Sequence, residues 1–243
     1  MIRALLVVLF LPGYTLIAGL VGYGLARLSR SPASLYALGR FGIRVALRLA
    51  GTRIEVLGKE RLGDHRNTVI VANHGSHLDA PVLLQALGVD FKAVAKKEIF
   101  RVPVLSSVLR LAGFIEVDRA DRTQATRAIA RAVAALKGGD CFLIFPEGTR
   151  SRTGELGPFK KGGFVVAMDA GSLIVPVALA GTRDLMPRGR FRIRPGTVRV
   201  RVLDPLPAGS YSYGDRDALI AEVRRRMAAA LTADGLGTRR ASP

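Results

Sequence analysis

The sequence predicts an α/β fold, a single domain with a largely parallel central sheet flanked by helices and preceded by a hydrophobic, membrane-anchoring helical segment. Short strands that are apolar throughout alternate with longer segments of helical periodicity, which is typical of parallel sheets covered on both faces. The 243 residues are enough to bury a substantial core as one domain. Because 49% of them are hydrophobic, general disorder is excluded.

The N-terminal segment is the most hydrophobic part of the chain, with no charged residue between Arg3 and Arg27. As one helix, residues 4–26 would extend about 35 Å, enough to cross the hydrocarbon layer of a membrane. Pro12 interrupts the run, so a kinked span and a pair of short interfacial helices are both possible. A cleaved signal peptide and a buried core helix are two further alternatives. We expect a membrane anchor, and the arginines after it place the rest of the chain on the cytoplasmic face of the cell membrane.

Residues 33–50 predict a second helix, which ends at Gly51. Arg40, Arg44 and Arg48 are spaced four apart and so form one stripe on this helix. The stripe suits either a solvated face or contact with lipid headgroups. We assign residues 1–50 to the membrane-anchoring segment.

The rest of the chain divides into a folded domain, 51–234, and a flexible polar tail, 235–243. Strands are expected at 53–57, 67–72, 91–95, 113–117, 140–145, 173–179 and 196–203. Helices are expected at 80–88, 99–111, 122–137, 162–170 and 215–232. The last helix repeats an apolar residue every fourth position and should face the core with Leu219, Val223, Met227 and Leu231.

The charge balance predicts a polyanionic partner, because 37 Lys and Arg against 19 Asp and Glu give a net charge of +18. No helix-turn-helix, RNA-binding or zinc-finger pattern is present, so we expect membrane lipids as partners and no nucleic acid. The single cysteine, Cys141, excludes an internal disulfide framework and is expected in the core.

The block from residue 73 to 79, Asn-His-Gly-Ser-His-Leu-Asp, follows a predicted strand. His74 can accept a proton near neutral pH, and a carboxylate such as Asp79 can fix its tautomer. Five residues span about 140° on a helix, so the two meet only if His74 precedes the helix and Asp79 lies in its first turn, with Ser76 as cap. Two alternatives are a capping box from Ser76 and Asp79, and a metal site that includes His77. The chain offers too few further ligands, so we expect no metal.

A second block, Phe145 to Ser151, follows another predicted strand. Gly148 lets backbone amides approach an anion, and the planar guanidinium of Arg150 matches phosphate oxygens. Glu147 could hold Arg150 or bond a substrate hydroxyl, although an ordinary turn with an exposed arginine is an alternative. Both blocks follow strands of a parallel sheet, where ligands bind beyond the carboxyl ends.

Further basic residues follow other strands. Asp118 and Arg119 end the strand that starts at Gly113, and Lys96 and Lys97 end the strand before it. Alternation places Glu116 with Asp118 on one strand face and Arg119 on the other. A basic β-ribbon, either solvated or contacting anionic lipid, is expected from Arg188, Arg190, Arg192, Arg194, Arg199 and Arg201.

These blocks, in this order, resemble the lysophospholipid acyltransferases of the 1-acyl-sn-glycerol-3-phosphate acyltransferase type. The resemblance covers about residues 53–205. Its four blocks are Asn73-His74 with Asp79, Gly113 to Arg119, Phe145 to Ser151, and Val175-Pro176-Val177. Glu116 departs from the family pattern, where this position is often apolar.

The resemblance implies transfer of a fatty acyl group from acyl-CoA or acyl carrier protein to the sn-2 hydroxyl of lysophosphatidic acid, without a cofactor. His74 would be the general base and Asp79 would orient it. The phosphate site of the acceptor would consist of Glu147, Gly148, Thr149, Arg150, Arg119 and Lys96. Another lysolipid, an aminolipid or a glycolipid remains an alternative acceptor, and a basic protein that only binds membranes or nucleic acid is the alternative outside catalysis.

Overall fold

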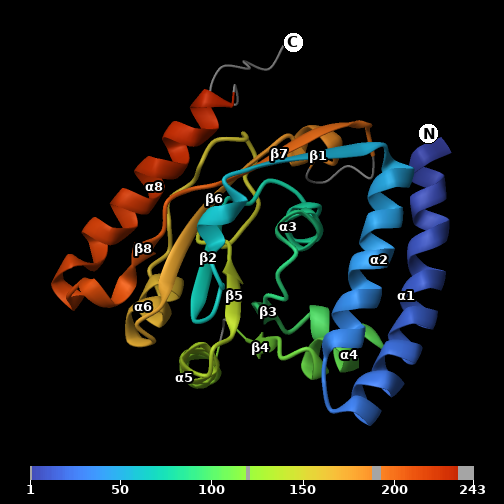
Figure 1. The fold of residues 1–243 in the computed structure, drawn as a ribbon, viewed down its shortest axis with the longest axis horizontal. Helices are drawn as coiled ribbons and strands as arrows, with labels where there is room; N and C mark the ends of the chain where they lie inside the picture. Colours follow the sequence, from blue (N-terminus) through green and yellow to red (C-terminus); the bar gives the residue numbers. More distant parts are fainter. Residues whose placement is uncertain (1, 119–120, 188–192, 235–243) are drawn as a thin grey trace.

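The computed structural model of the chain describes residues 2–118, 121–187 and 193–234 (Figure 1). Its helices are α1 (Ile2–Ser29), α2 (Ala33–Ala50), α3 (Asp79–Leu87), α4 (Leu105–Leu111), α5 (Arg122–Lys137), α6 (Gly162–Asp169), α7 (Thr182–Leu185) and α8 (Arg216–Ala233). Its strands are β1 (Thr52–Leu57), β2 (Thr68–Ala72), β3 (Val94–Lys96), β4 (Ile115–Val117), β5 (Cys141–Ile144), β6 (Leu173–Ala180), β7 (Gly196–Val202) and β8 (Leu206–Pro207). The expected tail, 235–243, lies outside the described residues.

The main sheet has the strand order β1-β7-β6-β2-β5, and β8 also pairs with β6. Strands β6, β2 and β5 run parallel, as do β1 and β7, whereas β7 and β8 are antiparallel to β6. A parallel bridge from Lys92 to Phe142 connects the β3–β4 pair to β5. The carboxyl ends of β6, β2, β5, β3 and β4 therefore face one edge, and the predicted, largely parallel sheet is confirmed.

Strand β2 lies at the centre of the core, and all five of its residues are buried. Ile70 belongs to a hydrophobic cluster with α3, while Val69 and Val71 belong to a cluster on the other face with α5, α6 and α8. The predicted stripe of α8 is confirmed, because Leu219, Val223, Met227 and Leu231 are all buried. Helices on both faces keep water from the sheet, so polar groups gather where the strands end.

Cys141 is buried in β5, as expected from the apolar run around it. Burial, with a further contribution from the charge of Asp140, raises the pKa of its thiol to about 12. A thiol with that pKa carries no charge at neutral pH and packs as a small hydrophobic side chain.

Helices α1 and α2 form an antiparallel pair beside the α/β layers (Figure 1). Contact between them is close, because a Cβ atom at Gly42 would lie 2.1 Å from the ring of Tyr14. The Tyr14 hydroxyl also donates a 2.7 Å hydrogen bond to the Leu38 carbonyl. α1 is one continuous helix with Pro12 inside it, so the two short helices considered from the sequence are not formed.

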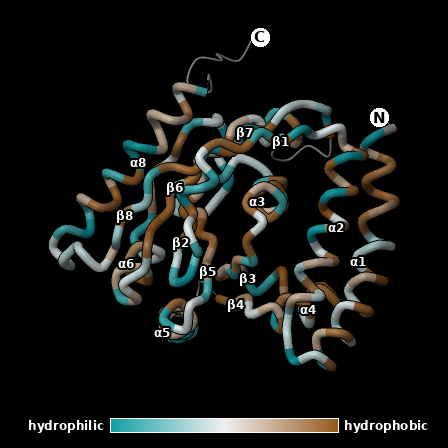
Figure 2. Tube along the Cα trace, in the orientation of Figure 1, coloured by the Kyte–Doolittle hydropathy of each residue, from teal (hydrophilic) through white to brown (hydrophobic). Residues whose placement is uncertain are grey.

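Most residues along α1 are hydrophobic (Figure 2). Residues Arg3–Ser29 are long and hydrophobic enough to cross a membrane, yet only 6% of their most apolar stretch is buried. Large hydrophobic side chains such as Leu9, Ile17 and Leu28 are at least 66% exposed. A buried core helix, one of the sequence alternatives, does not describe α1, because such a helix would hide these side chains.

Three expected elements differ from the observed ones. The helix predicted at 99–111 is divided into a 3₁₀ turn, Ile99–Arg101, and α4. Pro103 lacks the amide that would continue the first turn, and Val104 has a φ of 63°, outside the helical range. The strands expected at 91–95 and 113–117 are shortened to β3 and β4, where pairing with each other defines their length.

The basic β-ribbon is only partly described, since Arg188, Arg190 and Arg192 lie outside the described residues. Arg194 precedes β7 and is not in a strand. Within β7, Arg199 pairs with Glu55 and Arg201 pairs with Asp234. Of the three described arginines of the predicted ribbon, Arg199 and Arg201 are therefore paired with carboxylates, and Arg194 is exposed.

Candidate active site

Two loops meet beyond the carboxyl ends of β2 and β5. The Ser151 amide donates a 2.7 Å hydrogen bond to the His74 carbonyl, and the His74 amide donates a 2.8 Å hydrogen bond to Glu147 Oε1. The parallel register of β2 and β5 brings both loops to the same edge of the sheet. Two blocks that are about seventy residues apart in sequence therefore form one site.

His74 and Asp79 are in direct contact, with 2.7 Å between Nδ1 and Oδ2. Asp79 is the first residue of α3 and is fully buried, and its Oδ2 also accepts the amides of Gly75 and Ser76. Asp79 thus combines the two interpretations from the sequence, since one carboxylate orients the imidazole and binds backbone amides at the helix start. Ser76 does not cap α3: Leu78 holds that position, and the Ser76 hydroxyl donates to the Met186 carbonyl.

The imidazole of His74 is fixed on two sides. Its ring stacks on Phe145 at 4.2 Å between centroids and 15° between planes. Nδ1–H donates to Asp79, and within the described residues Nε2 has no hydrogen-bond partner. Because Nε2 is then the unprotonated nitrogen, it is the atom that can accept a proton from a bound hydroxyl.

The buried side chain of Glu147 connects the His74 loop to the segment at Gly157. Its side chain is 8% exposed, and its oxygens accept the His74 amide at 2.8 Å and the Gly157 amide at 3.1 Å. Burial raises the pKa of its carboxyl, and these two amide bonds oppose that rise. A buried carboxylate repels phosphate, so the geometry favours a positioning role for Glu147 over the acceptor contact expected from the sequence.

A turn at Gly148 comes directly after Glu147 in the chain. Gly148 has a φ of 70°, which favours glycine, and its amide donates to the Phe145 carbonyl. A Cβ atom there would lie 2.9 Å from Lys160 Nζ, so this lysine borders the turn. Thr149 is exposed and Arg150 is half-buried beside it. The turn thus brings an ammonium and a guanidinium close to the His74 loop.

Lys96 ends β3 at the same edge of the sheet and is exposed, while its neighbour Lys97 is paired with Asp118. Arg119, the other predicted phosphate ligand, lies outside the described residues. Glu116 pairs with Arg110 at 2.8 Å, and Val117 is buried on the opposite strand face. The predicted alternation along this strand is confirmed as far as it is described, and Glu116 points away from the core.

Three residues hold the loops in ways that the sequence did not indicate: Arg183 was not a candidate, and Asn73 and Phe145 were named in the motifs without a role. Asn73 exchanges two hydrogen bonds with the Leu179 backbone and so ties the end of β2 to β6. Arg183, after β6, donates to the Arg152 carbonyl, and Phe145 stacks on the catalytic candidate. An amide at a strand end and an aromatic ring before a turn were visible signals, but their partners are distant in sequence.

The Arg150 guanidinium lies close enough to the histidine loop to change a pKa. The pKa of His77 is lowered first by loss of water around the ring, then by the charge of Arg150 and by His74. We predict that Arg150→Gln raises the His77 pKa toward its ordinary value of about 6.5. Histidine Hε1 chemical shifts followed by NMR across pH 4.5–8 measure this, and an unchanged His77 titration would show that Arg150 is not near it.

The lowered pKa of His77 also makes the stability of the folded chain depend on pH. Because the folded-state pKa of His77 is depressed, protonation favours the unfolded chain as pH falls below the ordinary value. His77 therefore lowers the free energy of unfolding only at pH values below about 6.5. Arg150→Gln should make this decrease smaller.

Comparison with known proteins identifies the family of this chain. The model of the acyltransferase family matches residues 53–180. A chloroplast 1-acyl-sn-glycerol-3-phosphate acyltransferase of Arabidopsis thaliana is 37% identical over 179 residues, covering 72% of this chain and 48% of that protein. The human 1-acyl-sn-glycerol-3-phosphate acyltransferase alpha is 32% identical over 180 residues, covering 74% of this chain and 64% of that protein.

The fold matches as well. The crystal structure of the 1-acyl-sn-glycerophosphate acyltransferase of Thermotoga maritima has a TM-score of 0.84 and 25% identity, covering 99% of this chain and 97% of that one. This chain spans about half the length of the plant relatives, 45% and 48%. Since the family model matches residues 53–180, more than half of the chain, the chain belongs to the acyltransferase family.

Proposed function

We propose that the protein transfers a fatty acyl group from a thioester to the sn-2 hydroxyl of lysophosphatidic acid, giving phosphatidic acid in phospholipid biosynthesis. The observation that carries this proposal is the His74–Asp79 contact of 2.7 Å beside a turn that presents Arg150. The names of the relatives, which are 1-acyl-sn-glycerol-3-phosphate acyltransferases, support the acceptor.

In the proposed reaction, Nε2 of His74 removes the proton from the acceptor hydroxyl as its oxygen forms a bond to the thioester carbonyl carbon. The carbon–sulfur bond then breaks, and the leaving thiolate receives that proton from the imidazolium, which returns His74 to its neutral form. Asp79 stabilises that imidazolium, because its buried carboxylate faces Nδ1. General base catalysis contributes about 10²–10⁴ in rate, so the remaining acceleration must come from positioning both substrates.

The phosphate of the acceptor would bind Arg150, with Lys96, Arg119 and the Gly148–Thr149 turn around it. Phosphate oxygens suit the planar fork of an arginine, and the turn allows backbone amides to approach them. Lys160, which borders Gly148, adds a cation that the sequence alone did not indicate. The thioester already supplies the energy of transfer, so the proposal includes no metal and no cofactor.

The apolar surface of α1 supports a place for the protein at a membrane, where its lipid substrates dissolve. We propose the cytoplasmic face of the cell membrane, because arginines follow the apolar segment. The net charge of +18 would favour membrane lipids and either acyl donor, since acyl-CoA and acyl carrier protein are both negatively charged.

A thiol-release assay tests this function. The acyl group is presented in turn on CoA and on the carrier protein, with lysophosphatidic acid, monoacylglycerol, an aminolipid and a glycolipid as acceptors. We expect lysophosphatidic acid to be used and monoacylglycerol, which lacks the phosphate, to be used poorly. Arg150→Gln should raise the KM for lysophosphatidic acid by about tenfold, the value of one charge-assisted phosphate contact.

The matched control is Arg131→Gln, which removes an exposed arginine of α5. This change should leave the KM within about twofold, as expected for a surface charge remote from the site. Thiol release that is independent of phosphate on the acceptor, or equal KM values in the two variants, would contradict the proposed acceptor.

A further inference from the structure

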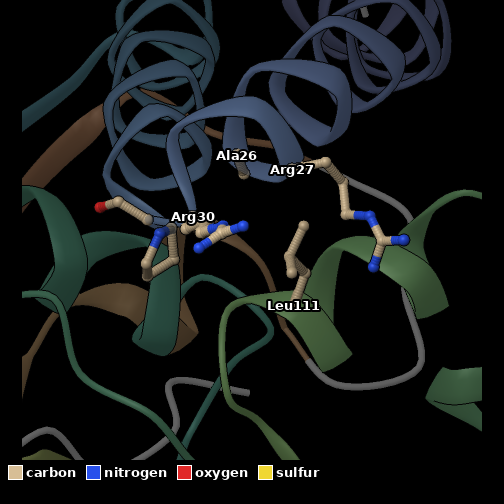
Figure 3. A pocket seen from close by; sticks show the side chains of 6 residues that line it. Ala26, Arg27, Arg30 and Leu111 are labelled. Atoms are coloured by element: carbon tan, nitrogen blue, oxygen red, sulfur yellow. The ribbon is translucent and has the colours of Figure 1, made fainter.

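A cavity of about 400 Å³ lies where the α1–α2 turn meets α4 (Figure 3). Its lining residues are Ala26, Arg27, Arg30, Ser31, Pro32 and Leu111. None of these residues belongs to the two loops that hold His74 and Glu147. Pockets that accommodate small ligands have volumes of roughly 300–1,000 Å³, so the size suits a headgroup.

Two guanidinium groups supply the polar part of the cavity. Figure 3 shows Arg27 and Arg30 on either side of Leu111, which projects from α4. Among the described residues neither arginine forms an ion pair, and Arg27 makes only a cation–π contact with Tyr23 at 5.9 Å. The first acidic residue in the whole sequence is Glu55, so α1 and α2 contain no carboxylate to neutralise them.

The backbone at Arg30 is unusual. Its φ is 53°, a left-handed conformation that glycine or asparagine normally adopts after a helix. The Ser31 hydroxyl accepts the Ala33 amide, and Pro32 has a fixed φ and restricts the preceding residue, Ser31, so the turn defines the path of the chain. A strained position occupied by arginine suggests a use for its side chain, because glycine would fit this turn with less strain.

The other part of the cavity is apolar. Ala26 is buried and Leu111 half-buried, and they adjoin the exposed hydrophobic surface of α1. Arg110, on the same helix as Leu111, is already paired with Glu116. The cavity therefore offers two unneutralised guanidiniums next to a surface suited to acyl chains, which is the chemistry of an anionic lipid headgroup.

We propose that this cavity binds the phosphate group of an anionic phospholipid, separately from the acceptor that is acylated. The two guanidiniums hold the phosphate oxygens, and the lipid chains extend along α1. The site would make the protein respond to the charge of its membrane. The proposal does not depend on the proposed reaction, because none of its residues has a role in acyl transfer.

The experiment uses the full chain purified in a neutral maltoside detergent, into which phosphatidylglycerol or phosphatidylcholine is titrated. Binding is followed by native mass spectrometry and by the lipid-dependent rise in Tm. We expect tighter binding of phosphatidylglycerol, and we expect Arg27→Gln with Arg30→Gly to weaken it by about tenfold, since two exposed charge-assisted contacts are lost. Without lipid, Arg30→Gly alone should have the same Tm as the original chain or a higher one.

The matched control is Arg44→Gln, which removes an exposed arginine of α2 that does not line the cavity. It should change the affinity for phosphatidylglycerol by less than about twofold, whereas a general charge effect would weaken it as much as the double variant. Equal affinities of the double variant and the original chain, or equal losses in the control, overturn the proposal.

A second arm separates the lipid from its phosphate. If millimolar sn-glycerol 3-phosphate competes with phosphatidylglycerol, and the double variant abolishes that competition, the guanidiniums recognise phosphate alone. If it does not compete while the double variant still loses lipid binding, the acyl chains are also required. Competition identifies the phosphate group as the ligand, whereas its absence identifies the intact anionic lipid as the ligand.

Discussion

His74→Ala should lower the rate of acyl transfer by at least about 10³-fold, while the chain remains folded. The imidazole is the only group in the described part of the site that pairs a free ring nitrogen with a buried carboxylate. Its removal leaves the acceptor hydroxyl without a base near neutral pH. Thiol release measured in membranes of a host that lacks its own enzyme tests the loss.

A matched variant in the same loop separates chemistry from folding. His77→Gln also removes an imidazole, but His77 is exposed and does not contact Asp79 through a hydrogen bond. We expect less than about a tenfold effect, as is usual for a surface substitution beside a site. If His74→Ala retained activity, or if the His77 variant lost as much, the assignment of His74 as the base would be wrong.

The sequence predicted the part of the site that depends on local geometry. A helix cannot place His74 and Asp79 on one face at a spacing of five, so the pair required a loop followed by a first helical turn, and this arrangement is present. The parallel sheet also placed the second block at the same edge. Both conclusions follow from chain periodicity, which is visible without tertiary contacts.

The sequence did not predict contacts that depend on the final position of distant segments. The partners of Glu147 are backbone amides at His74 and Gly157, and any residue can offer an amide, so no side-chain pattern indicates them. The reversal of β7 relative to β6 also has no local signal, because the alternation of buried and exposed residues in β7 is the same in either strand direction.

The break in the helix expected at 99–111 had a visible cause. Pro103 removes one amide, and a proline inside a helical pattern usually ends or bends the helix. Apolar periodicity on both sides hid this break, although the two halves pack as separate turns.

The second large effect concerns Glu147, for which the sequence and the structure suggest different roles. Glu147→Gln should lower kcat by about 10²-fold, because a shift of the His74 loop by about 1 Å can reduce the rate by that factor. The KM for the acceptor should change by less than about threefold. An amide side chain presents one carbonyl oxygen and one NH₂ group, so it can accept only one of the two backbone amides. The other amide is left without a partner in a buried place, at a cost of about 1–3 kcal/mol in the free energy of unfolding.

The pH dependence of stability provides an independent measurement. Burial raises the pKa of Glu147, so the folded chain loses stability as pH rises from the ordinary carboxyl value through this higher pKa. Glutamine does not ionise, and the free energy of unfolding of Glu147→Gln should therefore lack this decline. Urea unfolding between pH 4 and 7 would reveal the difference between the two chains.

The matched control for Glu147→Gln is a second glutamate in the same segment of the chain. Glu155→Gln changes an exposed carboxylate in the loop that Glu147 holds, and it should alter neither kcat nor stability appreciably. If Glu147 instead contacted the acceptor, its replacement would raise the KM and leave kcat near its original value. A loss confined to kcat, together with the altered pH dependence, would mean that this carboxylate acts through the backbone of His74 and not through the substrate.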